Sequence, residues 1–215
     1  MSATALAENP SKSKLLAAAV DVVRAKGYNA ARVDDICAAA GVTKGSFFHH
    51  FDSKDDLALA AAELWRMRAK SCLTQTALAG VADPLDRLFA YLDLRKSMMS
   101  GELADWTCFA GTMIQEVYAT HPALRDACQE SIAENARVLT ELIEAARRHH
   151  KIVADWGAES LARYIQTVIQ GAFIMAKGEG RTRAAHESMD HLRRYVELLF
   201  PRPRTNTRPT RPSAA

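Results

Sequence analysis

Residues 33–51 of the 215-residue chain read VDDICAAAGVTKGSFFHHF, and this stretch decides the fold of the first quarter of the protein. Its apolar side chains have the spacing of two short helices that pack on each other; they are Val33, Ile36, Ala40, Val42, Phe47 and Phe51. Gly41 stands at the bend, where a residue with positive φ is often required. The pattern therefore predicts a helix-turn-helix.

The second of these helices is expected over residues 44–50, with Thr43 as its N-terminal cap. Its exposed face would carry Lys44, Gly45, Ser46, His49 and His50. Glycine allows a close backbone approach, and lysine and serine can reach a base edge or a phosphate. Lys54, at the start of the next helix, would offer positive charge to a phosphate. The face favours double-stranded DNA as partner; a helical hairpin with a solvated polar face is the alternative.

The composition is that of a globular protein, with 48% hydrophobic and 25% charged residues. The net charge is only +3, so a surface that binds a polyanion must come from local clustering. Charged residues interrupt every long apolar stretch, and no secretory signal or membrane span is expected. The four cysteines, Cys37, Cys72, Cys108 and Cys128, lack the close spacing of a metal or redox motif. We expect free thiols, no metal and a cytoplasmic location.

Helical periodicity extends over almost the whole chain, and alternating strand patterns are absent, so the predicted fold class is all-α. The helices are expected at about residues 11 or 13 to 26, 33–40, 44–50, from Ser53 onward, 84–98, 104–119, 123–150, 156–177 and 184–199.

The expected organisation has four parts. Residues 1–10 are a disordered N-terminus, and residues 11–54 are a DNA-binding domain built on the helix-turn-helix. Residues 55–200 form a larger helical body. Residues 201–215 contain four prolines and four arginines without an aliphatic anchor, which predicts a disordered basic tail.

The stretch VDDICAAAGVTKGSFFHHFDSKDDL, residues 33–57, closely resembles the signature of TetR-type (TetR/AcrR) transcriptional regulators. The preceding KLLAAAVDVVRAKGYNAAR, residues 14–32, is similar to the first helix of that family and its Gly-Tyr exit. The resemblance covers about residues 13–60. It implies an all-α homodimer that binds operator DNA through its three-helix domain. It also implies an inducer-binding body, whose ligand shifts the fourth helices and separates the two recognition helices.

Carried over by position, the resemblance places Lys44, Gly45, Ser46, Phe48 and His50 on the recognition helix, and Lys54 beside a phosphate. Two positions depart from the family pattern. The family usually has tyrosine where this chain has Phe48, which removes a hydroxyl that could bind phosphate. It often has threonine or serine near Ala31, and here Arg32 is expected to supply a phosphate contact instead.

Two segments near the C-terminus have strong apolar faces. The resemblance implies that they form a four-helix dimer interface, through Leu161, Ile165, Val168, Ala172 and Met175 of the first segment and Met189, Leu192, Val196 and Leu199 of the second. The alternative is that each face belongs to an ordinary core.

An inducer pocket would lie among the middle helices. The stretch DWTCFAGTMIQEV, residues 105–117, brings large apolar groups together with few polar ones, which suits a small-molecule cavity. The candidate lining residues are Trp106, Cys108, Phe109 and Met113, with Gln170, Phe173 and Lys177 from a later helix and Trp65, Met67 and Tyr91 as further candidates. A plain core is the alternative.

The residues around Cys108, together with Lys177, are similar to the electrophile-sensing branch of the family, which includes the N-ethylmaleimide-responsive repressors. There a cysteine in the corresponding helix reacts and a lysine lies near it. A neighbouring ammonium would lower the pKa of the thiol and raise its thiolate fraction. An inert buried thiol is the alternative.

No enzyme is expected, because the chain lacks a Gly-rich phosphate loop after a strand, a His-Glu-x-x-His motif and a nucleophile elbow. No cofactor is implied. Adjacent helical residues point about 100° apart, so His149 and His150 are not expected to share a metal. A helical adaptor that uses its helix-turn-helix for protein contact remains the other alternative, and the salt dependence of binding distinguishes it from a DNA-binding protein.

Overall fold

The computed structural model describes residues 9–74 and 80–200, except for the side chains of residues 69–74. The described residues form ten helices and no strand, which confirms the all-α prediction. The predicted tail, residues 201–215, most of the predicted disordered N-terminus and the side chain of Cys72 lie outside the described residues. Of that N-terminus, Asn9 and Pro10 are part of the first helix and its cap.

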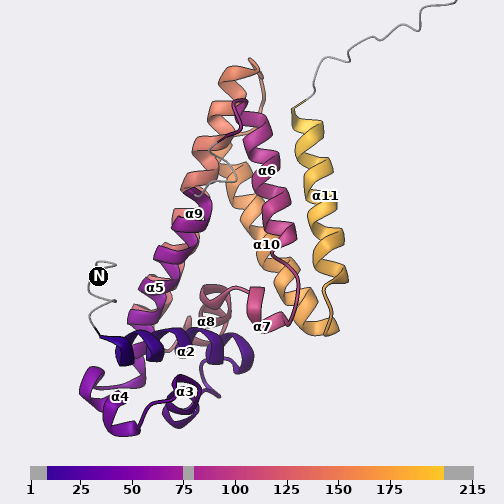
Figure 1. Ribbon diagram of the computed structural model, residues 1–215. Coiled ribbons are helices and arrows are strands. Elements are labelled where there is room, and N and C mark those ends of the chain that lie inside the picture. Colours follow the sequence, from indigo (N-terminus) through magenta and orange to yellow (C-terminus); the bar gives the residue numbers. More distant parts are fainter. Residues whose placement is uncertain (1–8, 75–79, 201–215) are drawn as a thin grey trace, which may run out of the picture.

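Three helices form a compact head at the bottom of Figure 1: α2 (Pro10–Lys26), α3 (Val33–Ala40) and α4 (Lys44–His50). The Asn9 side chain caps α2, and proline occupies its first turn, where no backbone N–H is needed. Gly41 ends α3 with φ of 63°, the left-handed conformation that glycine tolerates best. The predicted helix-turn-helix is therefore confirmed, with the bend at the predicted residue.

A long helix, α5 (Lys54–Thr74), leaves the head and rises beside α9 (Pro122–His149). The Ser53 hydroxyl accepts a hydrogen bond from the Asp56 N–H at 3.1 Å, as expected of the cap. Arg66 of α5 contacts Glu134 of α9 at 2.6 Å, while Glu63 holds the same guanidinium from within α5. The two helices are thus joined by a partly buried ion pair.

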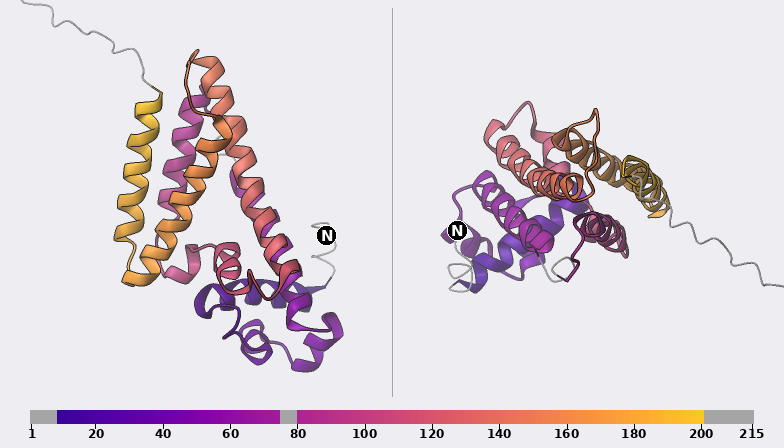
Figure 2. Two further views of the ribbon diagram at one scale, coloured as in Figure 1. Left: turned by 180° about the vertical axis from the view of Figure 1, so that it is seen from behind. Right: turned by 90° about the horizontal axis from the view of Figure 1, so that it is seen from above.

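The remaining helices form the body: α6 (Pro84–Ser97), α7 (Leu103–Trp106), α8 (Phe109–Val117), α10 (Ala158–Glu179) and α11 (Arg183–Leu199). Helices α10 and α11 lie side by side, and α11 is at the outer edge of the body (Figures 1 and 2). Asp83 accepts from the Leu85 N–H at 2.7 Å and caps α6, as its position before Pro84 predicts.

The single helix expected over residues 104–119 is a wrong prediction, because the chain forms α7 and α8 with a break between them. Thr107 has extended backbone angles, and Cys108 caps α8 by accepting the Gly111 N–H at its Sγ, 3.3 Å away. Residues that periodicity placed along one helix therefore lie on either side of a turn.

The apolar side chains form two clusters. The first lies within the body. The second joins the head to the first half of α5, to α8 and to the start of α9, and it includes Phe109, Met113 and Val117. Helix α8 thus belongs to the core of the head as well as to the body. The apolar core continues across the predicted domain boundary between residues 54 and 55.

Gly27, which ends α2, offers a test of how the head is joined to the body. Its φ of 86° and ψ of 163° lie in a region that only glycine adopts without strain, and a Cβ there would collide with the Glu116 carboxylate of α8. We expect Gly27→Ala to lower the free energy of unfolding by about 1–3 kcal/mol, measured by urea denaturation.

The matched control is Gly45→Ala, since Gly45 is helical and the nearest atom to a Cβ there is 3.8 Å away. The control should be neutral or raise stability by at most about 1 kcal/mol. Equal effects of the two substitutions would contradict this account of Gly27.

Candidate functional site

The candidate recognition helix, α4, is fixed by one polar cap and one buried ring. Thr43 Oγ1 accepts the Ser46 N–H at 3.2 Å, which confirms the predicted cap. Phe47 is fully buried in the head, whereas Phe48 next to it is 53% exposed. Because Phe47 anchors the helix to the head, Thr43, Lys44, Gly45, Phe48 and His49 are left exposed on its outer side.

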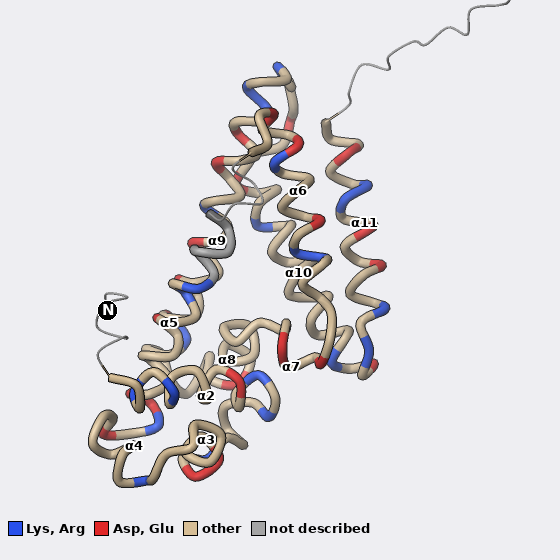
Figure 3. Tube along the Cα trace, viewed as in Figure 1, with Lys and Arg blue, Asp and Glu red and all other residues tan. Residues whose placement is uncertain are grey.

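The residues predicted to contact DNA fall into two groups in the structure. Arg32, Thr43, Lys44, Gly45, Phe48 and His49 are exposed, and Ser46 is half-buried. The Lys44 ammonium lies 3.0 Å from the Asp34 carboxylate in an exposed pair, which water and salt screen. In the head, lysines begin α4 and α5 and others lie on α2, while Asp34 and Asp35 lie in the first turn of α3, so charges of both signs lie around α4 (Figure 3).

His50 and Lys54 instead make contacts within the head. His50 Nε2 is 2.6 Å from the Ser11 hydroxyl of α2, and burial, followed by the charges of His49 and Lys12, lowers the pKa of His50. The Lys54 ammonium donates to the carbonyl oxygens of Tyr28 and Ala31 at 3.1 and 3.2 Å. Lys54 thus closes the loop between α2 and α3.

Tyr28, from the same loop, connects the head to α9. Its hydroxyl hydrogen-bonds the Asp55 carboxylate, and burial and this bond raise its pKa. The His121 ring lies edge-on to the Tyr28 ring, with centroids 5.7 Å apart, and 3.7 Å separates His121 Nε2 from Asp55.

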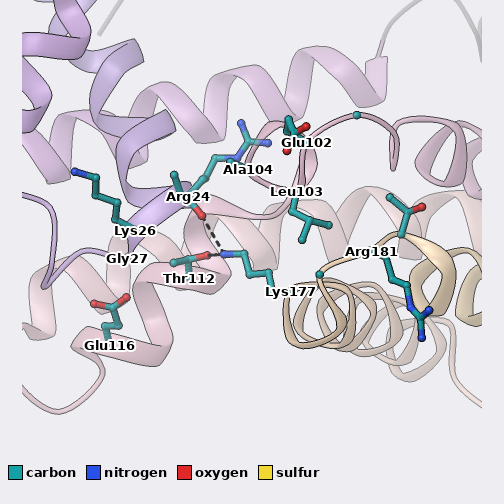
Figure 4. Close-up of a pocket in the computed structure, with 14 residues that line it drawn as sticks. Arg24, Lys26, Gly27, Glu102, Leu103, Ala104, Thr112, Glu116, Lys177 and Arg181 are labelled. Atoms are coloured by element: carbon teal, nitrogen blue, oxygen red, sulfur yellow. Dashed lines mark hydrogen bonds between the residues drawn. The ribbon is translucent and has the colours of Figure 1, made fainter.

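The end of α2 is held against the body by three polar contacts. The Arg24 guanidinium is buried, and its Nε donates to the carbonyl oxygen of Thr107 at 2.8 Å. The Lys177 ammonium of α10 donates to the Arg24 carbonyl at 3.2 Å and contacts the Thr112 hydroxyl of α8 at 2.9 Å (Figure 4). Glu116 of α8 accepts the Asn29 N–H at 2.7 Å.

Burial lowers the pKa of both cations at this junction. For Arg24 the loss of water is the largest cause, and Asp21 opposes it. For Lys177 the loss of water is again the largest cause, and the Arg24 charge adds to it. Cations that are this desolvated are costly to leave without their acceptors, so the junction is held as a unit.

A cavity of about 290 Å³ lies beside this junction. Its lining includes four of the predicted ligand-binding residues: Trp106, Cys108, Gln170 and Phe173. Trp65, a further candidate, also lines it. The Trp106 and Phe173 rings pack with centroids 5.7 Å apart.

The other three predicted ligand-binding residues do not line this cavity. Phe109 and Met113 are fully buried in the core shared by head and body, because the break before α8 turns them toward the head. Lys177 holds Arg24 and Thr112 instead, and it lines a second, more open hollow of about 700 Å³ beside Gly27 (Figure 4).

Gln170 apart, the polar lining of the cavity was not predicted from the sequence; it consists of Arg24, Arg68, Arg95, Asp105, Asn135 and Gln166. These residues come from α2, α5, α6, α7, α9 and α10, and in sequence they resemble solvated positions or helix-end charges. Only the tertiary arrangement brings them together.

Cys108 is the half-exposed thiol among the three cysteines whose side chains the structure describes. Cys37 and Cys128 are buried, and burial raises the pKa of Cys128 to about 12. A thiol attacks electrophiles as its thiolate, so the buried Cys128 is poorly suited to that reaction.

The predicted dimer-interface residues mostly point inward. Leu161, Ile165 and Ala172 of α10 and Leu192 and Val196 of α11 are buried in the core of the single chain, and Val168 and Leu199 pack partly against that core. The alternative of an ordinary core therefore describes the position of these five buried residues. Met175 is exposed.

A different face of the same two helices is exposed and apolar. It carries Tyr164, Ile174 and Met175 on α10 and Tyr195 and Leu198 on α11. The Tyr164 and Tyr195 rings meet edge-on, with centroids 5.2 Å apart, so exposed aromatic side chains of the two helices lie against each other. In the sequence, the apolar residues of this exposed face form a weaker pattern than the regularly spaced apolar residues that face the core.

One group of side chains far from the head could hold a metal ion: Asp83, His149 and His150. One ligand atom from each lies within 4.8 Å of the others, and His150 Nε2 is 2.9 Å from the Asp83 carboxylate. The two adjacent histidines thus lie near one carboxylate, although adjacent helical residues point about 100° apart. Asp83 already caps α6, however, and His149 is exposed, so hydrogen bonding accounts for the group.

None of the described helices has both the length and the apolar character that crossing a membrane requires.

Comparison with known proteins agrees with this geometry. Residues 15–61 match the family model of bacterial regulatory proteins of the tetR family, and residues 84–192 match that of the tetracyclin repressor-like C-terminal domain. The transcriptional regulator AcuR of Cereibacter sphaeroides is 30% identical over 172 residues, which cover 80% of this chain and 78% of AcuR. The transcriptional repressor NemR of Escherichia coli is 22% identical, over 88% of this chain and 95% of NemR.

Among solved structures, a regulatory protein TetR from Rhodobacter sphaeroides is similar, with a TM-score of 0.78 and 28% identity over 87% of this chain and 99% of that one. The two family models together span the head and most of the body, in the order that the fold requires. The chain therefore belongs to the TetR family of DNA-binding transcriptional regulators.

Proposed function

We propose that this regulator is a homodimeric, cytoplasmic repressor that leaves its operator when a small molecule fills the cavity beside Arg24. Residues 11–54 serve as the DNA-binding domain and residues 55–200 as the ligand-binding and dimerisation domain. The observation that carries the proposal is that Arg24, a residue of the head, lines the cavity. An occupant would therefore touch the head directly. We assign no catalytic role.

Operator binding is assigned to the exposed residues around α4. Lys44 and Arg32 supply positive charge to phosphates, and Gly45 allows the backbone to approach. Phe48 presents a ring that can pack against the thymine methyl group or the sugar. His50 and Lys54 act indirectly, because their contacts to α2 and to the loop after it hold α4 in place.

Release follows from the junction at the end of α2. The Arg24 guanidinium donates to Thr107 and lies over the Trp65 ring, 5.3 Å from its centroid. A ligand that draws this guanidinium into the cavity weakens the contact and moves α2, and α3 and α4 pack on α2. Two half-sites about 34–36 Å apart must be engaged together, so a small movement of each head lowers affinity strongly.

Dimerisation is assigned to the exposed face of α10 and α11. Tyr164, Ile174, Met175, Tyr195 and Leu198 leave an apolar surface unpartnered in the single chain. Large exposed apolar patches on helices commonly mark interfaces between proteins. A second copy, related by a two-fold axis, would cover this surface with the same surface of its own.

The DNA assignment predicts the effect of Lys44→Gln on the affinity for the DNA upstream of the regulator's own gene. We expect binding to weaken at least tenfold, measured by fluorescence anisotropy with excess competitor DNA. The slope of log affinity against log salt should fall by about two units, because one phosphate contact is lost at each half-site.

Lys151→Gln is the matched control, since Lys151 is exposed at the far end of the body. It should leave both affinity and slope unchanged. Salt-insensitive binding by the unaltered protein, or equal effects of the two substitutions, would favour the helical adaptor that uses α4 for protein contact.

The interface assignment predicts that Ile174→Asp converts the dimer to monomers. Ile174 is 51% exposed, so the substitution leaves the chain's own core intact while placing a charge in the proposed interface. Sedimentation velocity should show about half the native mass, and operator binding should be lost. Val153→Asp, at a fully exposed residue, should remain dimeric. A dimeric Ile174→Asp protein would place the interface elsewhere.

A thiol-reactive inducer would act through Cys108, which is half-exposed and lines the cavity. We expect N-ethylmaleimide to release the operator complex of the unaltered protein, because alkylation adds bulk beside Arg24 and Trp106. Cys108→Ser should abolish that release, whereas Cys128→Ser should not, since Cys128 is buried. Release that persists in Cys108→Ser would leave only the non-covalent route.

A further inference from the structure

The cavity beside Arg24 has an unusual lining for its size. Trp65, Met98, Met99, Trp106 and Phe173 provide apolar walls. Three arginines, Arg24, Arg68 and Arg95, face the same space, with Asn135, Gln166 and Gln170 as neutral polar groups. Asp105 is the carboxylate that also lines it. Three cations against one carboxylate leave an excess of positive charge in a space walled by indole and phenyl rings.

Two of the lining residues carry buried N–H donors without an acceptor. The Nε of Arg95 and the indole Nε1 of Trp106 are both inaccessible to solvent, and neither has a hydrogen-bond partner among the described residues. Trp106 as a whole is 8% exposed. A buried donor without an acceptor costs about 1–3 kcal/mol, more if it is charged. Both side chains line the cavity, so an acceptor group bound there would lie beside both of them.

The arginines are also weakly neutralised by the protein. Among the residues that the structure describes, no carboxylate lies within 4.0 Å of the Arg68 or Arg95 guanidinium. Among the described residues, the one carboxylate within 4.0 Å of Arg24 is that of the exposed Asp21, at 3.7 Å; its other contacts are the bond to Thr107 and the Trp65 ring. Arginine presents a planar fork of donors that matches the two oxygens of a carboxylate. The missing partner is therefore an anion with an apolar body.

We propose that the inducer is a small organic carboxylate, held at its charged end by Arg95, Trp106 and Arg24. Its apolar end packs against Trp65 and Phe173. The cavity lies at the lower end of the range of about 300–1,000 Å³ for ligand pockets, so the acid is a small one. The proposal rests on the proposed function, because it names the ligand class of the same cavity. It adds the reason for release: the carboxylate competes with the Thr107 carbonyl for Arg24.

The test uses the full-length protein without DNA and matched pairs of acid and primary amide. The probes are benzoate and benzamide, 3-phenylpropionate and its amide, and hexanoate and hexanamide, at pH 7. Each amide keeps the shape of its acid but carries no charge, and it has an NH2 donor in place of one acceptor oxygen. Affinity is measured by titration calorimetry, with quenching of tryptophan fluorescence as a second readout, since Trp65 and Trp106 line the cavity. At least one acid should bind ten or more times as tightly as its amide.

Two variants assign the charged end. Arg95→Met keeps an unbranched side chain, though a shorter one, and removes its donors, and Trp106→Phe keeps a ring and removes its N–H. Each should weaken binding of the acid at least tenfold while changing the amide's affinity less than threefold. Arg148→Met, at an exposed arginine on the far end of α9, is the control and should change neither.

Three results would overturn the proposal: amides that bind as tightly as their acids, acids whose affinity is unchanged in both variants, or no binding by any acid of the panel. Adding operator DNA separates this proposal from the function on which it rests. An acid that binds the cavity but does not release DNA leaves the ligand class standing and removes the release mechanism. If no acid binds but an uncharged or thiol-reactive compound releases DNA, the ligand class is wrong and the proposed function still stands.

Discussion

The hydrogen bond from Arg24 to the carbonyl oxygen of Thr107 is the contact on which the arrangement of this regulator depends. It joins the last turn of α2, in the head, to the turn between α7 and α8, in the body. A guanidinium that is buried this deeply must keep its acceptors, because it has lost the water that would otherwise solvate its charge. The same loss of water lowers the pKa of Arg24. The break at Thr107 supplies one of these acceptors, since a carbonyl in an uninterrupted helix would be bonded within that helix.

The contact matters more because the head has no separate core. Phe109, Met113 and Val117 of α8 lie in the same apolar cluster as the side chains of α2, α3 and α4. Lys177 and Glu116 then fix the backbone at the end of α2 from two further helices. Close-packed elements of this kind move as bodies rather than deform continuously. A change at Arg24 is therefore expected to displace the recognition helix as a whole, without melting it.

The sequence was most informative where local rules decide the structure. The cap at Thr43, the bend at Gly41 and the order of the helices followed from residue types and spacing, and the family followed from the same stretch. It was less informative where a decision depends on tertiary contact. Periodicity could not reveal the break at Thr107, which sends Phe109 into the head and Trp106 into the cavity. On α10, periodicity indicated the more strongly apolar face, and the chain buries that face in its own core.

Charged residues were the hardest to interpret in sequence, because their position in a helix fits several roles. Arg24 and Arg95 each lie in the last turn of a helix, where a cation is explained by the helix dipole alone. Only the fold shows that both face one cavity.

The energies involved are sufficient for regulation. A hydrogen bond to a charged group contributes about 1.5–3 kcal/mol, and allosteric coupling typically amounts to about 1–3 kcal/mol. Weakening of the one hydrogen bond between Arg24 and Thr107 is therefore comparable in free energy with typical allosteric coupling. The proposed switch therefore requires no large rearrangement of the body, only a ligand that competes with the Thr107 carbonyl for the Arg24 guanidinium, which lines the cavity.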